Sequence, residues 1–300
     1  MTHLDLIATR DDRVLAQASF AGSASYVTVS GVEHGPRTVL TLDGLTAAGD
    51  VVGHGRTCPV DFEHRGMEAP LYFAPTNFFA PTAGPPATTR LDPVAVPLAD
   101  GTVLLAGGGD GAGVVADAEL FSPGGATFAP AAMALNVPRQ GAEAVLVPNV
   151  GALVTGGRDG SGQPIARAEV FDEAQRQFLS LPDDARLDAR FGHRAVLLAD
   201  GRTVLISGGQ SQAAKALTST VFIKVQPGGV APISAGPPLS TARYQHAAVV
   251  AVGGPVMIGG YGIDGVPLAS IEALRPADGA QPAAFVPIAS LRFARAEATA

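Results

Sequence analysis

The stretch RFGHRAVLLADGRTVLISGG, residues 190–209, decides the fold, because its pattern returns at a nearly fixed interval along the chain. An arginine is followed by an apolar run, a turn, a second apolar run and a pair of glycines. These pairs are Gly107-Gly108, Gly156-Gly157, Gly208-Gly209 and Gly259-Gly260, and they lie 49, 52 and 51 residues apart. A period of this length is typical of proteins built from small units that stack on their neighbours to form a core.

Each copy of the pattern divides into four short strands. In the third copy the first strand is AVLLA and the second is TVLIS, and the Asp200-Gly201 dipeptide between them favours a tight hairpin turn. The third strand carries Glu-x-Phe and the fourth a later aromatic residue. We align Glu119, Glu169, Thr220 and Glu272 at one position of the third strand, and Phe121, Phe171, Phe222 and Leu274 two residues later. Four antiparallel strands in every copy predict the blades of an all-β propeller.

This repeat resembles that of the kelch family of galactose-oxidase-type β-propellers, whose blades carry Gly-Gly at the end of the second strand. The resemblance covers residues 88–300 and implies blades at 88–138, 139–189, 190–242 and 243–294, with a fifth beginning at 295. The form DG-x-V-L-x-x-GG is closer to bacterial kelch-like proteins than to animal adaptors, and the chain lacks the tryptophan that kelch blades commonly carry. Proteins of the bacterial type resemble exported or cell-surface proteins, so the resemblance implies that location, although MTHLDLIATRDDR contains no signal peptide.

The first part of the chain lacks the repeat. Residues 1–66 alternate polar and apolar residues in short runs such as RTVLTLDGL, which predicts half-buried strands. We interpret them as a small β-sandwich, similar to immunoglobulin-like or transthyretin-like modules. Residues 67–87 are rich in proline and form a linker. Because Phe73-Ala74-Pro75 repeats the fourth-strand motif Phe128-Ala129-Pro130, an alternative is that residues 70–75 add the outer strand of the last blade and close the ring.

The number of blades leaves the ring incomplete. Propellers have about 4–8 blades, and this chain provides four and the first strand of a fifth. Three interpretations follow. The chain is a fragment of a longer protein, which we favour, or it closes as a small ring, or it leaves an open edge that self-associates with a second copy.

The composition excludes several classes of protein. The net charge is −7 and only two lysines occur, so the chain has no basic surface for nucleic acid. No apolar run reaches the roughly 18 residues of a membrane span. Cys58 is the only cysteine, which excludes an intrachain disulfide.

No motif for catalysis, a metal or a cofactor occurs in the sequence. His193 and His246 each follow an arginine by three residues, but an apolar residue takes that position in the other copies, so a metal site would lack ligands. The copper site of galactose-oxidase-type enzymes needs a propeller cysteine, and Cys58 lies outside the repeat. We therefore expect no metal, no cofactor and no enzymatic activity.

An arginine opens each copy of the repeat. These residues are Arg90, Arg139, Arg190 and Arg243, and Arg295 opens the fifth copy. We expect a structural role, because a guanidinium has five donors and ties loops to carbonyl groups or to the recurring glutamates. The alternative is a rim of exposed arginines that binds an anion.

The loops after the Gly-Gly pairs differ from copy to copy. Variable polar loops on a constant scaffold are typical of a binding site on a rigid fold. The candidate contact residues in these loops are Asp110, Arg158, Asp159, Gln210, Gln212, Tyr261 and Asp264. The alternative is that the Asp-Gly pairs among them serve only to form turns.

These observations favour a non-catalytic binding module that presents propeller loops to a protein or glycan partner. The alternative is a carbohydrate- or alcohol-active enzyme whose site lies in the channel or in missing blades. Propellers serve both enzymes and scaffolds, so the fold alone does not choose between them.

Overall fold

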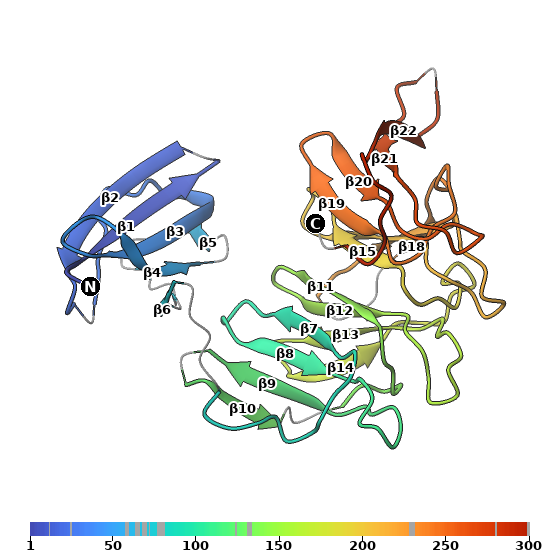
Figure 1. Cartoon of the computed structure of the whole chain (residues 1–300), viewed down its shortest axis with the longest axis horizontal. Helices are drawn as coiled ribbons and strands as arrows, with labels where there is room; N and C mark the ends of the chain where they lie inside the picture. The colour runs from blue at the N-terminus through green and yellow to red at the C-terminus, as the bar shows by residue number, and fades with distance from the viewer. Residues whose placement is uncertain are drawn as a thin grey trace. The chain divides into compact units, whose positions relative to one another are not determined.

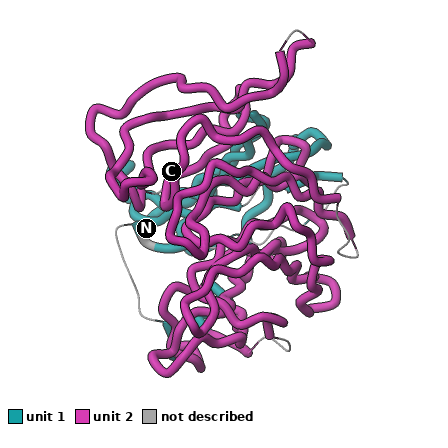
Figure 2. Tube along the Cα trace, turned by 90° about the vertical axis from the view of Figure 1, so that its right-hand side faces the viewer, with its two compact units in different colours: residues 1–85, 122–127 teal, residues 86–121, 128–300 magenta. Residues whose placement is uncertain are grey.

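The computed structural model describes all residues except 12, 25, 58–59, 64–66, 68–70, 72, 77–81, 124, 131–133, 228–231, 280 and 299–300. The described residues form strands, turns and isolated bridges, and none of them lies in an α-helix. No described segment is therefore a helix long and apolar enough to cross a membrane. The chain divides into two compact units (Figure 2), which consist of residues 1–85 with 122–127 and of residues 86–121 with 128–300.

The first unit is built on one six-stranded antiparallel sheet (Figure 1). Its strands are β1 (His3–Arg10), β2 (Arg13–Ala21), β3 (Gly35–Leu45), β4 (Val51–Arg56), β5 (Val60–Phe62) and β6 (Phe73–Pro75). The order across the sheet is β2-β1-β3-β4-β6, and β5 pairs with the first part of β3. The alternation predicted for RTVLTLDGL is present in β3, where Leu40 and Leu42 are buried and Thr41 and Asp43 are less so.

One side of this sheet holds the core of the first unit. Leu6 and Leu42 pack there with Val27, Val29 and Val32, which come from the segment between β2 and β3. The described residues of that segment form no strand, and they cover the side on which the second sheet of a sandwich would lie. The antiparallel strands are as predicted, but in the described residues they form a single sheet packed against a loop segment.

The alternative in which residues 70–75 supply a blade strand is wrong for the described part of that segment. β6 pairs with β4, with Ala74 opposite His54, and so extends the first sheet. The ring of Phe73 explains this placement, because it packs in the core of the first unit directly over two glycines. A Cβ atom on Gly53 would lie 2.3 Å from the Phe73 ring, and one on Gly44 would lie 2.6 Å from it. Residues 70 and 72 lie outside the described part of the chain.

The second unit contains four antiparallel sheets of four strands, one for each complete copy of the repeat (Figure 1). We call these sheets blades 1 to 4. Blade 1 has β7 (Val94–Pro97), β8 (Val103–Ala106), β9 (Ala118–Ser122) and β10 (Thr127–Pro130), and blade 2 has β11 (Glu143–Val147), β12 (Gly151–Thr155), β13 (Ala168–Asp172) and β14 (Gln177–Ser180). Blade 3 has β15 (Arg194–Leu197), β16 (Thr203–Ser207), β17 (Thr220–Lys224) and β18 (Ile233–Ala235), and blade 4 has β19 (Ala247–Ala251), β20 (Gly254–Ile258), β21 (Ser270–Arg275) and β22 (Ala284–Ser290).

The blades stack face to face in chain order. The first strands of successive blades lie side by side, β7 with β11, β11 with β15, and β15 with β19. Apolar side chains fill the space between the blades, and the larger of those fully buried on the second strands are Leu104, Leu153, Val154, Val204, Leu205, Ile206 and Met257. The second strand of an inner blade is therefore apolar on both faces, as its continuous apolar run predicts.

A comparison of equivalent aromatic pairs shows that each blade depends on its neighbour for burial. Phe171 and Phe178 lie 5.1 Å apart on the side of blade 2 that faces blade 1, and they are 1% and 5% exposed. Phe121 and Phe128 form the same pair in blade 1, 4.9 Å apart, but both are only partly buried. The same residues in the same geometry are thus fully buried only where another blade covers them.

The third blade corrects the alignment of the repeat. In blades 1, 3 and 4 the amide of the first glycine donates to the carbonyl oxygen of Asp117, Ser219 and Ser270, respectively. This bond fixes the register of the third strand. Val221, not Thr220, therefore stands where the other blades have glutamate. Phe222 consequently packs toward blade 4, on the opposite side from the Phe171 position, because the two orientations alternate along a strand.

Main-chain hydrogen bonds join each blade to the next. The amide of the second glycine of each pair donates to the carbonyl oxygen of the next copy's arginine. The four bonds run from Gly108 to Arg139 (2.8 Å), Gly157 to Arg190 (3.0 Å), Gly209 to Arg243 (2.9 Å) and Gly260 to Arg295 (2.9 Å). Arg295 therefore makes the same joint to blade 4 that the other arginines make to the preceding blade.

Candidate binding face

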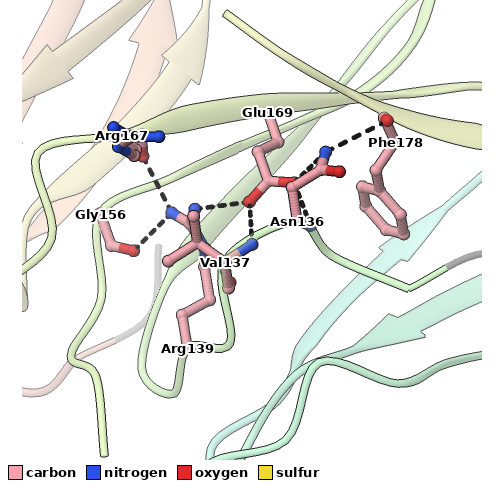
Figure 3. Close-up of polar contacts among 7 residues, drawn as sticks. All are labelled: Asn136, Val137, Arg139, Gly156, Arg167, Glu169 and Phe178. Carbon is pink, nitrogen blue, oxygen red and sulfur yellow. Dashed lines mark hydrogen bonds and ion pairs between the residues drawn. The ribbon is translucent and has the colours of Figure 1, made fainter. Parts of the chain in front are cut away.

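The arginine of the second copy lies inside its blade rather than on the surface (Figure 3). Nη1 of Arg139 donates to the carbonyl oxygens of Gly156 (2.9 Å) and Arg167 (2.8 Å), and Nη2 pairs with the Glu169 carboxylate at 2.7 Å. The same carboxylate accepts hydrogen bonds from the backbone and side-chain amides of Asn136. The guanidinium and the carboxylate are both fully buried, and both have hydrogen-bond partners. They therefore stabilise the blade and do not bind a ligand.

Two other blades repeat this ion pair. Arg90 pairs with Glu119 at 2.9 Å, and Arg243 pairs with Glu272. The side chains of all four residues are at most 4% exposed. These arginines therefore do not form the exposed anion-binding rim that was the alternative.

In blade 3 the equivalent arginine, Arg190, has no glutamate as its partner. Arg190 instead pairs with Asp188 at 3.2 Å and donates to the hydroxyl of Ser219 at 3.0 Å. The Asp188 side chain is 46% exposed, so this pair is weaker than the buried pairs of the other blades. Burial lowers the pKa of Arg190 to about 10, which still leaves the guanidinium charged at neutral pH.

The two propeller histidines lie in the joints between blades. Nε2 of His193 lies 2.8 Å from the Thr155 hydroxyl, and Nε2 of His246 lies 2.9 Å from the Ser207 hydroxyl. Both rings are fully buried, and Nδ1 of each has no hydrogen-bond partner among the described residues. Among those residues no three side chains are grouped in a way that could hold a metal ion.

The buried histidines predict a loss of stability in mild acid. Burial lowers the pKa of both His193 and His246 well below the usual value of 6.5, so the unfolded chain binds these two protons before the folded chain does. The contribution of these neutral histidines to stability is therefore fully present well above pH 6.5. As the pH falls below that value, the free energy of unfolding drops by up to about 1.4 kcal/mol per pH unit for each histidine. Urea unfolding between pH 7 and pH 5 should show this slope, and His193→Gln should reduce it. An unchanged slope in that variant would contradict the assignment.

The three aspartates proposed as contacts are engaged in their own turns. Oδ1 of Asp110 accepts the amides of Ala112 and Gly113, both at 2.8 Å. Asp159 accepts the Ser161 amide and hydroxyl, and Asp264 accepts the amide of Val266. The hydrogen bond from the Ser161 hydroxyl is the largest cause of a lowered pKa of Asp159. These carboxylates shape the loops, and their remaining oxygens stay exposed for the contacts that the sequence predicts.

The loops after the Gly-Gly pairs share one further feature. In each blade, the residue after the pair forms an isolated β-bridge with the residue after the arginine. The bridged pairs are Leu91 with Gly109, Gln140 with Arg158, Phe191 with Gln210, and Tyr244 with Tyr261. Because equivalent loops of stacked blades emerge at the same end of the sheets, these eight residues lie along one side of the unit. We call them the loop face.

Side chains link the loop face from blade to blade. The guanidinium carbon of Arg158, in blade 2, lies 3.3 Å from the ring centroid of Phe191, in blade 3. In blade 4, Tyr244 stacks on Tyr261 with the ring centroids 5.2 Å apart. A Cβ atom on Gly192 would lie 3.9 Å from Tyr244, so the segment after Phe191 adjoins the tyrosine pair. Blades 2, 3 and 4 thus contribute aromatic and cationic side chains that follow one another along the loop face, and we call Arg158, Phe191, Tyr244 and Tyr261 the row.

The remaining predicted contacts lie at the edge of this row or beyond it. The Gln210 side chain donates to the carbonyl oxygen of Ala214 at 2.8 Å and closes its own loop. Gln212 is exposed in the turn of the same loop. Prediction from the sequence missed Phe191 and Tyr244, because they directly follow an arginine and lie outside the variable loops in which contacts were expected. The signal was present, since Leu91, Phe191 and Tyr244 share one position of the repeat.

A second polar cluster lies on the innermost strands. Glu143 of β11 and Arg194 of β15 form an ion pair across adjacent blades, and Arg194 also donates to the carbonyl oxygen of His246 at 2.7 Å. Burial raises the pKa of the Glu143 carboxyl, and the neighbouring guanidinium opposes that effect. Each group is the other's partner, which favours a structural role in the wall of the second unit.

Comparison with known proteins identifies the fold. The solved structure of YjhT, a β-propeller, superimposes on this chain with a TM-score of 0.61, over 87% of this chain and 83% of that one. The chain has a β-propeller fold. The two sequences are 12% identical in the alignment, so the likeness shows the fold alone. No family model matches the chain, and neither does any curated protein sequence.

Proposed function

We propose that the chain is a non-catalytic binding module, a kelch-type propeller that docks a protein partner on the loop face. The Gly-Gly pairs bond each blade to the next, and the buried arginines and glutamates pair with each other inside the blades. These residues are therefore not available to a binding partner. The observation that carries the proposal is the row formed by Arg158, Phe191, Tyr244 and Tyr261, which is held in place by stacking but is only partly buried.

The chemistry of the loop face supports a protein partner. Tyrosine, phenylalanine and arginine are the residues most enriched at the centres of protein interfaces, where they provide most of the binding energy. Exposed aliphatic side chains extend the row on the same loops. Ile263 is 80% exposed, Val266 is 54% exposed and Leu91 is 65% exposed. Such side chains lose unfavourable contact with water when a partner covers them.

The same side chains make a glycan a less suitable partner. A sugar surface carries many hydroxyl groups, each of which needs a hydrogen-bond partner when it is buried. Aliphatic groups such as Ile263 and Val266 offer none, and the aspartates nearby already accept hydrogen bonds from their own turns. The glycan is therefore kept as an outcome of the experiment.

An enzyme has less support than a binding module. The described hollows include a void of about 10 Å³ beside Arg190 and an open groove of about 400 Å³ beside Arg167 and Asp183. The void has room for about one water molecule. The groove is lined by an exposed ion pair and by none of the eight loop-face residues.

The test is capture of a partner by the whole chain and by a loop-face variant. We expect Tyr261→Ala to weaken the binding of any captured protein at least tenfold, because it removes an aromatic group from the row. Val252→Ala is the matched control. Val252 is fully exposed, but it lies in the β19–β20 hairpin at the opposite end of blade 4. Titration by calorimetry measures both affinities.

Three results would contradict the proposal. One is a captured protein that binds wild type and Tyr261→Ala equally well. Another is binding on a glycan array that Tyr261→Ala abolishes, which would make the ligand a glycan. The third is turnover of a carbohydrate or an alcohol by the purified chain, which would favour the enzyme.

A further inference from the structure

The Arg158 side chain differs from the arginines inside the blades. Each of those reaches a carboxylate and at least one carbonyl oxygen. The Arg158 side chain makes no hydrogen bond and no ion pair with any described residue, and its Nε atom is buried without a partner. Its backbone forms bridges to Gln140 and Pro164, and its side chain stacks on Phe191. A partly buried guanidinium without a counter-ion raises the free energy of the free protein. A negatively charged group on a binding partner would offset that cost.

The stacking of Arg158 on Phe191 sets the direction in which that partner approaches. A separation of 3.3 Å requires the plane of the guanidinium to lie nearly flat on the ring. One face of the guanidinium is therefore covered, and its N–H groups lie along its edge, in the plane parallel to the ring. A guanidinium presents these donors as a rigid fork that matches the two oxygens of a carboxylate.

We propose that Arg158 is the anchor of the loop face for an acidic side chain, aspartate or glutamate, of the protein partner. This inference rests on the proposed function and adds the chemical class of the contact. The carboxylate takes the free edge of the guanidinium, and the aliphatic and aromatic groups of the row cover the pair and reduce its access to water. The chain carries a net charge of −7 and as a whole repels an acidic peptide. Binding of such a peptide would therefore require a local positive group such as Arg158.

The first experiment uses a defined probe, an N-acetylated hexaglutamate peptide with a fluorescent label, and hexaglutamine as its neutral counterpart. We expect wild type to bind hexaglutamate, more weakly as salt is added, and not to bind hexaglutamine. Arg158→Gln should weaken binding at least tenfold, because it removes the charge and keeps most of the length of the side chain. Arg158→Lys should recover only part of the affinity, because an ammonium group lacks the fork.

The matched control removes the same charge elsewhere in blade 2. Arg167 is 54% exposed and pairs with Asp183 on the surface, so Arg167→Gln should leave hexaglutamate binding unchanged. Phe191→Leu keeps Arg158 but removes the aromatic support, and it should weaken binding as well. Far-ultraviolet circular dichroism and urea unfolding establish that each variant is folded.

The outcomes separate this inference from the proposed function. Failure of wild type to bind hexaglutamate, or equal binding by wild type and Arg158→Gln, would overturn it, and so would equal losses in Arg158→Gln and Arg167→Gln. A captured protein that is lost with Tyr261→Ala and kept with Arg158→Gln would leave the loop face as the binding site and remove the acidic contact. A captured protein that is kept with Tyr261→Ala would instead overturn the proposed function.

Discussion

Replacing Glu169 with alanine should lower the free energy of unfolding by about 3–5 kcal/mol, the usual cost of removing one partner of a buried ion pair. Arg139 would keep its three carbonyl acceptors but lose its counter-ion in a site where its side chain is 1% exposed. The amide groups of Asn136 would also lose their acceptor, so the loop that leads into blade 2 would loosen. Urea unfolding at pH 7 measures the effect.

The exposed pair of Arg167 and Asp183 provides the comparison for this prediction. Both side chains are more than half exposed, and Asp183→Ala should cost less than about 1 kcal/mol. If the Glu169 and Asp183 variants are destabilised equally, the recurring ion pair does not hold the blade. The double variant Arg139→Met, Glu169→Leu should recover part of the loss, because apolar groups of similar size leave no buried charge unpaired.

Replacing Gly156 with alanine should cost about 2–5 kcal/mol, since backbone strain and steric overlap add. The backbone at Gly156 has φ +58, a left-handed conformation that side chains disfavour. A Cβ atom there would also lie 2.6 Å from the carbonyl oxygen of Arg190 and 2.5 Å from Cε1 of His193. The methyl group would therefore push blades 2 and 3 apart at their joint.

Gly162 separates the two contributions. It also has a positive φ of +80, but no atom would lie within 4 Å of its Cβ. Gly162→Ala should therefore show only the backbone strain, about 1–2 kcal/mol. Chemical denaturation of both variants gives the difference. If that difference is zero, the contact between blades adds nothing to the requirement for glycine at position 156.

The repeat period was enough to predict the blades, their number and the strand that precedes each Gly-Gly pair. It was not enough to place every residue within a blade. Thr220 and Phe222 resemble the Glu-x-Phe of the other copies by spacing and type, whereas the register is set by the amide of Gly208 on the Ser219 carbonyl. Residue type and spacing can be matched one residue out of register. In the sheet, a shift of one residue moves every side chain of the strand to the opposite face.

Other misses have a common physical cause, which is contact between segments far apart in the chain. Phe73 is followed by the same two residues as Phe128, but its ring fills the space over Gly44 and Gly53, so it joins the first sheet. Phe191 acquires its importance from Arg158, which lies in the loop of the preceding copy. Differences between the copies indicate the variable loops, but they do not indicate the aromatic residues that those loops contact.

The joints between blades also bear on how such a chain grows by duplication. The bond from the second glycine to the next arginine's carbonyl uses main-chain atoms alone, so any copy can follow any other as far as that bond is concerned. The adjoining side chains are not interchangeable, because Thr155 meets His193 and Ser207 meets His246. At the first joint, alanines at 106 and 142 replace the hydroxyl and the imidazole. Each joint therefore carries a matched pair split between two copies, and shuffling the copies would place an imidazole against alanine. Whether two copies fit together therefore depends on both neighbours, and not on the single repeat.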